Sequence, residues 1–222
     1  MKTTLIIPAK NEEATIEGVL RHCRPFADDI LVVDGHSTDN TREIALKMGA
    51  RVVSDHGKGK GDGVRVGIQE ATGDILVFID ADGSHVPQDI PRLVQPIRDG
   101  KADLVIGSRM TGGSDELHGT VNRFIRMTGS HIILLLINYR WNIRLTDVQN
   151  GFRAINAQVA RKLSLRENSH SIEQEMIMKC AKRGYRLAEV PSHEFERRYG
   201  KSTIQLKTAW LRFGWCFLKN YF

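Results

Sequence analysis

The chain has 222 residues, of which 41% are hydrophobic, and a formal net charge of +6. This length suffices for one large domain or two small ones with a substantial core, and the charge favours anionic partners: nucleic acid, acidic lipid or phosphorylated substrates. Three cysteines without a CxxC pair argue against a disulfide framework and indicate reduced thiols in the cytosol. The N-terminal apolar run is too short for a signal peptide, and the longest aliphatic run, 132–137, is far below the roughly 20 residues that span a bilayer. We expect a chain that does not cross a membrane by itself, although it could lie on one.

The first half alternates short apolar runs with helical patterns. Most runs are continuously apolar, which is typical of parallel strands that are covered on both faces. We expect strands at 4–8, 30–33, 51–54, 75–79 and 104–107. Between them, N-cap residues, an initial proline and terminal glycines favour helices at 12–23, 38–48, 62–71 and 87–98. The alternation predicts an α/β fold built on an open, mostly parallel sheet with helices on both faces.

The second half is expected to extend this sheet rather than to form an independent domain. Its patterns predict a strand at 185–190 and helices at 120–139, 156–163, 171–183 and 203–222. The helix over 120–139 begins basic and ends aliphatic, and the tail mixes six aromatic residues with lysines and an arginine. Both compositions suit helices that lie at a membrane surface, and the tail equally suits a helix that packs on the core.

Four polar clusters follow predicted strands: PAKNEE, DGHSTD, DADGSH and GSRMTGG. The carboxyl ends of parallel strands share one edge of a sheet, and ligands of such sheets bind beyond that edge. We therefore expect the four clusters to converge on one rim, where a ligand would bind.

Within DADGSH, Asp80 and Asp82 stand one residue apart directly after a buried strand. Residues at i and i+2 of a strand share a face, so both carboxylates can reach one ion. Hard divalent cations such as Mg²⁺ or Mn²⁺ take oxygen ligands, often one or two carboxylates plus phosphate oxygens. The pattern favours a metal site, with a solvated turn that caps the next helix as the alternative.

Two basic loops and the histidines are less informative by themselves. The stretch DHGKGKGDG matches neither the P-loop nor the dinucleotide-binding glycine pattern, and alone it indicates a flexible basic loop. The stretch ERRYGKS offers guanidinium groups suited to phosphate, although such charge runs are usually solvated surfaces. No HxxxH or HExxH pair occurs, which argues against zinc, and Glu173 and Glu175 would lie on different faces of a helix.

Taken together and in order, the motifs resemble glycosyltransferase family 2, most closely its enzymes of the dolichol- and polyprenol-phosphate mannose synthase type. The resemblance covers nearly the whole chain and is carried by IIPAKNEE, VVDGHSTDNT, GKGKGDGVRVGI, FIDADGSH, VIGSRM, TDVQNGFRAI and ERRYGKS. It implies the GT-A fold, a Rossmann-like open sheet, in a single catalytic domain over 1–222. Residues 1–110 would form the nucleotide-sugar-binding half, and 111–222 the acceptor-binding half with its membrane-surface helices.

The resemblance also implies roles for individual residues. Asp80 and Asp82 would hold Mg²⁺ or Mn²⁺, and the catalytic set would be Asp82, Asp147 and Arg197. The nucleotide sugar would be bound by Pro8, Ala9, Asn11, Glu12, Asp34, Lys60, Asp80, Ala81, Asp82 and Arg109. The acceptor phosphate would be bound by Arg123, Arg197, Lys201 and Ser202. Asp147 would be the base if one is needed, or else would order its loop with Arg153.

Three positions depart from the family's pattern. Ser84 stands where the family often has a glutamine that can be a third metal ligand, and its shorter side chain would act through water. Gly35 replaces the second carboxylate after the second strand, which changes the contacts with the nucleotide base. Thr203 replaces the usual lysine of GxSK, which removes one contact with the acceptor phosphate.

The resemblance implies a metal-dependent, inverting transfer of mannose from GDP-mannose to a polyprenyl phosphate of the dolichyl type. A phosphate acceptor is already anionic and needs no general base, whereas a sugar hydroxyl would need one. Within the family, the alternative is a UDP-sugar donor carrying glucose or N-acetylhexosamine, with a polyprenyl phosphate or a saccharide as acceptor. A nucleotidyltransferase also uses paired carboxylates, and a nucleic-acid binder is suggested only by charge; the carboxylate rim argues against the binder. We expect a cytoplasmic protein, peripheral on the cytoplasmic face of the membrane, where a separate membrane protein could assist.

Overall fold

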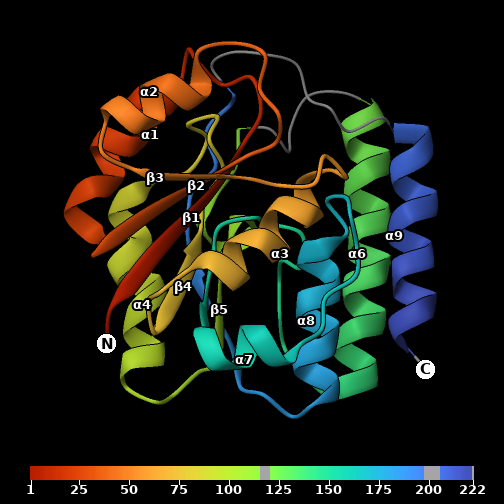
Figure 1. Ribbon diagram of the computed structural model, residues 1–222. Coiled ribbons are helices and arrows are strands. Elements are labelled where there is room, and N and C mark those ends of the chain that lie inside the picture. Colours follow the sequence, from red (N-terminus) through yellow and green to blue (C-terminus); the bar gives the residue numbers. More distant parts are fainter. Residues whose placement is uncertain (116–120, 198–205, 222) are drawn as a thin grey trace.

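The computed structural model describes residues 1–115, 121–197 and 206–221, with side chains for all of these except 121–127 and 206–210. At its centre is a seven-stranded sheet in the order β3-β2-β1-β4-β6-β5-β7 (Figure 1). Neighbouring strands are parallel except where β6 is involved. The strands are β1 (Thr3–Ala9), β2 (Asp29–Asp34), β3 (Arg51–Ser54), β4 (Ile75–Phe78), β5 (Leu104–Ser108), β6 (Arg153–Asn156) and β7 (Leu187–Pro191). The predicted open, mostly parallel sheet is confirmed, and every strand expected in the first half is present.

Helices cover both faces of the sheet, as predicted (Figure 1). One face carries α1 (Ile16–Cys23), α2 (Thr41–Lys47) and α4 (Ile90–Arg98). The other carries α3 (Lys60–Glu70), α6 (Val121–Trp141), α7 (Ala157–Lys162), α8 (Ile172–Lys182) and α9 (Leu206–Tyr221). A short α5 (Arg109–Gly112) follows β5, and two 3-10 turns span Arg24–Phe26 and Pro87–Asp89. Side chains alternate along β1, so Leu5 and Ile7 pack in the core under α1, α2 and α4, whereas Ile6 packs in the core on the opposite face of the sheet.

The helices α1 and α2 begin later than their sequence patterns predict, at Ile16 rather than Glu12 and at Thr41 rather than Thr38. The polar residues before them form hydrogen bonds between loops instead of continuing the helix. The Asp39 carboxylate, for example, accepts a hydrogen bond from the Glu13 backbone N–H at 3.1 Å. Asp, Asn and Thr side chains offer the backbone such alternatives, which is why they favour turns and helix ends.

The sequence does not predict β6, which runs antiparallel between β4 and β5. Its four residues begin with Arg153, which is fully buried and interrupts the apolar pattern by which the other strands are recognised. The Arg153 guanidinium donates to the backbone oxygens of Asn150 and Glu173. Because β6 separates β4 from β5, the residues that follow β5 lie two strand spacings, about 10 Å, from those that follow β4.

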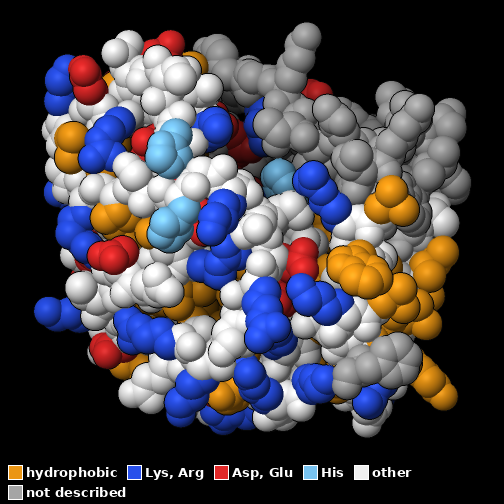
Figure 2. Space-filling view, turned by 45° about the vertical axis from the view of Figure 1, so that its right-hand side comes forward, with side chains coloured by type: hydrophobic (Ala, Val, Ile, Leu, Met, Phe, Trp, Pro, Cys, Tyr) orange, Lys and Arg blue, Asp and Glu red, His pale blue; other side chains and the backbone are white. Residues whose placement is uncertain are grey.

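The helices α6 and α9 lie side by side at the outer side of the second layer (Figure 1). On its inner face α9 buries Cys216 and Asn220, and its Phe217 and Tyr221 pack against the core. The outer face of the pair is apolar, and Figure 2 shows hydrophobic side chains gathered on this side of the molecule. We call this surface the apolar strip: Ile132, Leu135, Leu136, Tyr139, Leu211, Trp215 and Leu218. In the described parts of the chain, no helix combines the length and hydropathy needed to cross a bilayer.

Candidate active site

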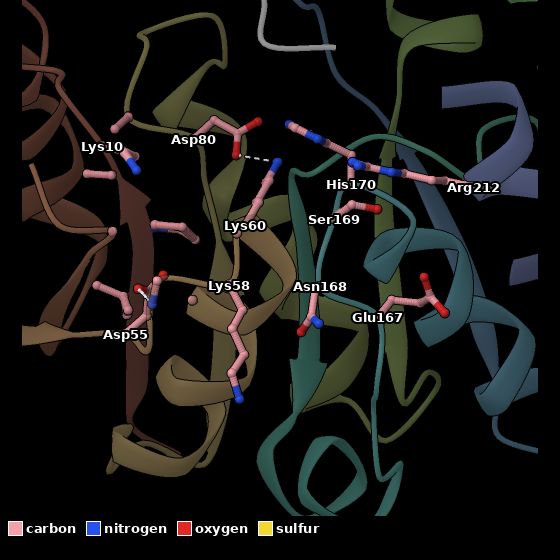
Figure 3. Close-up of a pocket in the computed structure, with 18 of the residues that line it drawn as sticks. Lys10, Asp55, Lys58, Lys60, Asp80, Glu167, Asn168, Ser169, His170 and Arg212 are labelled. Atoms are coloured by element: carbon pink, nitrogen blue, oxygen red, sulfur yellow. Dashed lines mark hydrogen bonds and ion pairs between the residues drawn. The ribbon is translucent and has the colours of Figure 1, made fainter. Parts of the chain in front are cut away.

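A cleft of about 890 Å³ lies at the carboxyl ends of β1, β2, β3 and β4, the edge at which open α/β sheets bind ligands. Residues 166–170 and residues of α9 line its opposite side, so both halves of the chain contribute (Figure 3). The predicted nucleotide-sugar residues in its lining are Pro8, Ala9, Glu12, Lys60, Asp80, Ala81 and Asp82. Arg197, predicted to bind the acceptor phosphate, lines the same cleft.

Asp80 and Lys60 form an ion pair in the wall of this cleft (Figure 3). Lys60 Nζ lies 2.7 Å from Asp80 Oδ1 and 3.0 Å from Glu173 Oε1. Burial would raise the pKa of the Asp80 carboxyl, but the charge of Lys60 holds that pKa well below its ordinary value. Burial would lower the pKa of the Lys60 ammonium group, but the two carboxylates raise it instead. Asp80 is therefore anionic at neutral pH, with 28% of its side chain exposed.

Asp82 is oriented by Ser84 and paired with Arg197. Its Oδ1 accepts hydrogen bonds from the Ser84 backbone N–H at 3.0 Å and from the Ser84 hydroxyl at 2.7 Å. Its Oδ2 lies 2.7 Å from the Arg197 guanidinium, which also lies 4.0 Å from Glu12 Oε1. Burial raises the pKa of the Glu12 carboxyl above its ordinary value. Ser84, one of the three residues that depart from the family's pattern, thus fixes the direction of the Asp82 carboxylate.

The two carboxylates fit a divalent cation that is shared with a substrate. Among the described residues, no group of three or more His, Cys, Asp or Glu side chains is arranged to hold a metal ion. Mg²⁺ in particular is usually bound through one or two carboxylates, with waters and substrate phosphates completing its shell. Asp80 and Asp82 each already pair with a cationic side chain. This donor set suits an ion that binds together with a diphosphate rather than one enclosed by protein ligands.

The glycine-rich stretch GKGKGDG has a packing role that the sequence does not reveal. A Cβ atom on Gly59 would lie 2.6 Å from the backbone oxygen of Asn168, and one on Gly61 would collide with that of Glu167. The Gly61 N–H donates to the Asn168 oxygen at 3.0 Å. The glycines therefore allow residues 166–170 to approach closely and to line the cleft. Closely spaced glycines are a general sign of such an approach, although they do not reveal the partner segment.

Further basic side chains at the cleft come from segments for which the sequence predicts no site role. His170 is the last residue of the stretch 166–170, and Arg212 belongs to α9 (Figure 3). Lys219, also in α9, lines the cleft as well. Burial lowers the pKa of His170, and the charge of Lys60 lowers it further, so the imidazole is neutral at neutral pH. Lys219 lies 3.6 Å from Glu167. The basic residues of the tail were the only sequence signal for this contribution.

Asn11 and Asp34, predicted to contact the nucleotide, hold the loops beside the cleft and are not part of the lining that the described residues form. The Asn11 Oδ1 accepts from the Thr38 N–H at 2.8 Å, and the Asn11 N–H donates to the Ser37 hydroxyl at 2.9 Å. Asp34 Oδ1 accepts from the Ser37 N–H at 3.2 Å. These bonds join the turn after β1 to the turn after β2. Asn11 adopts φ 56°, a left-handed conformation that asparagine tolerates well.

Arg109 and Asp147 form a buried ion pair outside that lining. Arg109 Nε donates to Asp147 Oδ2 at 2.6 Å, and a second guanidinium nitrogen lies 3.1 Å from Oδ1. Glu194 lies 3.3 Å from the same guanidinium. Burial would raise the pKa of the Asp147 carboxyl, but Arg109 lowers it below its ordinary value. The Asp147 carboxylate also accepts the backbone N–H groups of Gln149 and Asn150, and so it orders its own loop.

Two expectations about this region are therefore corrected. The four polar clusters share one edge of the sheet but do not all line the cleft, because β6 lies between β4 and β5 and separates the cluster after β5 from the others. The loop of Asp147 is ordered with Arg109, whereas Arg153 donates to backbone oxygens. Arg123 lies in α6 with its side chain outside the described part, and Lys201 and Ser202 lie outside the described residues.

Comparison with known proteins identifies the relatives of this chain. The family model for glycosyl transferase family 2 matches residues 4–164. The chain is 33% identical over 202 residues to glycosyltransferase AglJ of Haloferax volcanii, an alignment that covers 90% of this chain but only 65% of that protein. It is 33% identical over 221 residues to undecaprenyl-phosphate mannosyltransferase of Micrococcus luteus, covering 92% of this chain and 88% of that protein.

Among solved structures, a similar fold occurs in glucosyl-3-phosphoglycerate synthase of Mycobacterium tuberculosis, in complex with Mn²⁺, uridine diphosphate and glucosyl-3-phosphoglycerate. The TM-score is 0.76 at 23% sequence identity, over 99% of this chain and 79% of that one. At this identity the likeness concerns the fold alone. The sheet has the arrangement of the GT-A fold. Because the family model matches most of the chain, the chain belongs to glycosyltransferase family 2.

Proposed function

We propose that this glycosyltransferase is metal-dependent and inverting, and that it moves mannose from GDP-mannose to a polyprenyl phosphate. The observation that carries the proposal is the gathering of charges in one cleft, where Asp80 and Asp82 stand beside Lys60 and Arg197. Such a site can balance a diphosphate leaving group against an anionic acceptor. The relative named undecaprenyl-phosphate mannosyltransferase supports the choice of sugar and acceptor.

Asp80 and Asp82 would hold Mg²⁺ or Mn²⁺, which when bound would neutralise charge on the departing diphosphate. The similar solved structure, which contains Mn²⁺ and uridine diphosphate, supports this assignment. Lys60 keeps Asp80 ionised, and Ser84 keeps the Asp82 carboxylate in one orientation. The chain itself therefore supplies two fixed anions at the position where the diphosphate would lie.

We assign donor binding to residues 1–110, where Pro8, Ala9, Glu12 and Ala81 line the cleft. Asn11 and Asp34 would act indirectly, by fixing the loops that carry these residues. A UDP-sugar carrying glucose or N-acetylhexosamine is the second candidate donor, because the similar solved structure was crystallised with uridine diphosphate. A donor with either base would present the same diphosphate to the two carboxylates.

The acceptor phosphate would be bound by residues 111–222, through Arg197 together with Arg123, Lys201 and Ser202. A phosphate oxygen would attack C1 of the sugar as the bond between C1 and the diphosphate breaks, which inverts the configuration at C1. No proton has to be removed from an anionic acceptor, so no general base is needed. Asp147 is poorly placed to act as one, because Arg109 engages both of its oxygens outside the cleft lining.

A polyprenyl acceptor requires access to a bilayer, and we propose that the apolar strip of α6 and α9 provides it (Figure 2). Trp215 and Leu211 are 66% and 76% exposed, and inserting such side chains between lipid headgroups favours membrane binding. Arg212 and Lys219 on the same helix line the cleft, so the proposed membrane contact adjoins the proposed acceptor site. We place the protein in the cytoplasm, peripheral on the cytoplasmic face of the membrane, with a separate membrane protein as an additional anchor.

A thermal-shift titration with GDP, UDP, GDP-mannose and UDP-glucose, each with and without Mn²⁺, tests the donor. A ligand that binds the native state raises the melting temperature by mass action. We expect a metal-dependent rise with the two guanine nucleotides. A rise with the two uracil nucleotides alone would move the donor to a UDP-sugar, and no rise with any of the four would contradict the proposed donor site.

A further inference from the structure

One end of the cleft is an apolar slot that ends at a carboxylate. A Cβ atom on Gly63 would stand 3.6 Å from Pro8 Cβ, 3.7 Å from Val33 Cγ1 and 3.5 Å from Asp55 Oδ2. The three side chains therefore converge on one point, and the absence of a side chain at Gly63 keeps that point open. All four residues line the cleft. Narrow apolar walls with one polar group at the end suit a flat heterocycle with hydrogen-bond donors on its edge.

The Asp55 carboxylate is buried, and one of its oxygens is left open. Its side chain is only 5% exposed, and Oδ1 accepts the Gly57 N–H at 2.7 Å. His36 Nε2 lies 3.0 Å from the Asp55 backbone oxygen and 3.6 Å from Oδ1, which helps to fix the turn. Oδ2 accepts no hydrogen bond from any residue in the described ranges. Because Asp55 lines the cleft, this oxygen can accept a hydrogen bond from a bound ligand.

The position of Asp55 relative to the two metal-site carboxylates matches the length of a nucleotide. Asp55 follows β3, and Asp80 follows β4, with β2 and β1 between these strands. Three strand spacings of about 4.8 Å place the two residues about 14 Å apart along the edge of the sheet. An extended nucleoside diphosphate can bridge this span, with its phosphates at Asp80 and its base at Asp55.

We propose that Asp55 recognises the base of the donor through hydrogen bonds and selects guanine. This inference rests on the proposed nucleotide-sugar function. Guanine presents two adjacent donors, the N1–H and the N2 amino group, and an ionised carboxylate only accepts hydrogen bonds. Uracil presents one N–H between two carbonyl oxygens, and the partial negative charges of these oxygens are repelled by a carboxylate. In adenine and cytosine, the amino group stands beside a ring nitrogen that accepts hydrogen bonds, as a carboxylate does, so only one of the two positions can donate to Asp55. Guanine is the base whose edge matches Asp55 best, and Asp55 follows β3 beside Gly35, because β2 and β3 pair with Asp34 opposite Ser54.

Isothermal titration of the full chain with GDP, IDP and UDP in Mg²⁺ tests this assignment, because IDP lacks only the N2 amino group. We expect GDP to bind about tenfold more tightly than IDP and about a hundredfold more tightly than UDP, since hydrogen bonds to charged groups are strong. Asp55→Asn retains an oxygen for the Gly57 N–H but adds a donor, so it should reduce the preference for GDP over UDP to less than about tenfold. Asp99→Asn, at an exposed carboxylate on the C-terminal end of α4, is the matched control and should bind like the wild type.

Gly63→Ala provides a test that does not depend on the folding of the Asp55 variant. The added methyl group meets its neighbours at ordinary contact distance, and alanine favours the helix, so the melting temperature should not fall. The methyl group would occupy the slot, and GDP binding should weaken at least about tenfold, as expected for a filled pocket. Three results would each overturn the inference and leave the proposed transferase function standing. The wild type could bind UDP as tightly as GDP, Asp55→Asn could keep the preference for GDP, or Gly63→Ala could bind GDP as tightly as the wild type. Wild-type protein that binds none of the three nucleotides would overturn both.

Discussion

The ammonium group of Lys60 bridges Asp80 and Glu173, at 2.7 Å and 3.0 Å from their carboxylate oxygens. The bridge links the first residue of α3 to the end of β4 and to α8, and so it joins the two halves of the chain at the cleft. It also keeps Asp80 ionised in a partly buried position. The cleft thus depends on a cation supplied by the glycine-rich stretch.

Lys60→Met should destabilise the fold, because it leaves two carboxylates near each other without their shared cation. Removing one partner of a buried ion pair typically costs about 3 kcal/mol or more in the free energy of unfolding. Urea denaturation would measure the change. Lys58→Met, at an exposed neighbouring lysine, is the control and should leave the midpoint close to that of the wild type. Equal midpoints for the two variants would mean that the bridge does not stabilise the fold.

Arg197→Ala should impair transfer far more than folding. The Arg197 side chain is 28% exposed at the surface of the cleft, and it pairs with Asp82 at 2.7 Å. Removing one group that stabilises developing charge typically lowers the rate about a hundredfold. Steady-state kinetics with varied acceptor would measure this effect beside the melting temperature. Arg92→Ala, at an exposed arginine of α4 that pairs with Asp89, should keep full activity. Unchanged acceptor kinetics in Arg197→Ala would remove that residue from the acceptor site.

Asp147→Asn should lower stability in a pH-dependent way. The pKa of Asp147 lies below its ordinary value of 3.8 in the folded chain, so its stabilising effect is fully present above 3.8 and is lost as the pH falls through the lower folded value. At neutral pH we expect a loss of about 3 kcal/mol in the free energy of unfolding. Asp103→Asn breaks an ion pair whose arginine is 57% exposed and should cost about 1 kcal/mol at most.

The same comparison separates a structural role of Asp147 from a catalytic one. Denaturation curves at a series of pH values would give the stability difference from the wild type, and activity per folded molecule would be measured beside them. A loss of turnover without any loss of stability would make Asp147 a base after all. Loss of stability with turnover largely retained is the result that the buried pair with Arg109 predicts.

The regular α/β half could be predicted because its strands are continuously apolar and its helices have clear ends. The strand β6 could not, since it is short and begins with a buried arginine whose partners are the backbone oxygens of Asn150 and Glu173. The local pattern also places Arg109 with the nucleotide-sugar residues, because only the insertion of β6 shows how far the end of β5 lies from Asp80 and Asp82. Residues 166–170 carry no motif, and their place at the cleft follows from packing on Gly59 and Gly61.

The sequence was more informative about local neighbours than about roles in the site. Glu173 and Glu175 have separate partners, as their spacing predicts: Lys60 for the first and Lys179 for the second. The sequence indicates no role for Asp55, because a single carboxylate in a basic loop carries no pattern. Only the structure indicates a role in base recognition, because residues of β1, β2 and α3 form a slot beside the Asp55 carboxylate.

Trp215→Asp combined with Leu211→Asp should weaken binding to vesicles of acidic phospholipid. Both side chains are mostly exposed, so the fold should be retained, whereas insertion between headgroups becomes unfavourable. Each lost apolar side chain is worth about 1.5–3 kcal/mol when fully buried, so vesicle binding should fall at least about tenfold. Co-sedimentation would measure it. Leu46→Asp, at a 52% exposed leucine of α2, is the control, and equal sedimentation of both variants would refute the membrane role of the apolar strip.

The most direct test of the central claim is transfer of labelled mannose from GDP-mannose to polyprenyl phosphate in vesicles, with and without Mg²⁺ or Mn²⁺. The wild type should form lipid-linked mannose only when the metal is present. Asp82→Ala should remain folded and lose transfer, because the carboxylate beside the diphosphate is gone. Full transfer by Asp82→Ala, or transfer that continues after the metal is chelated, would contradict the account.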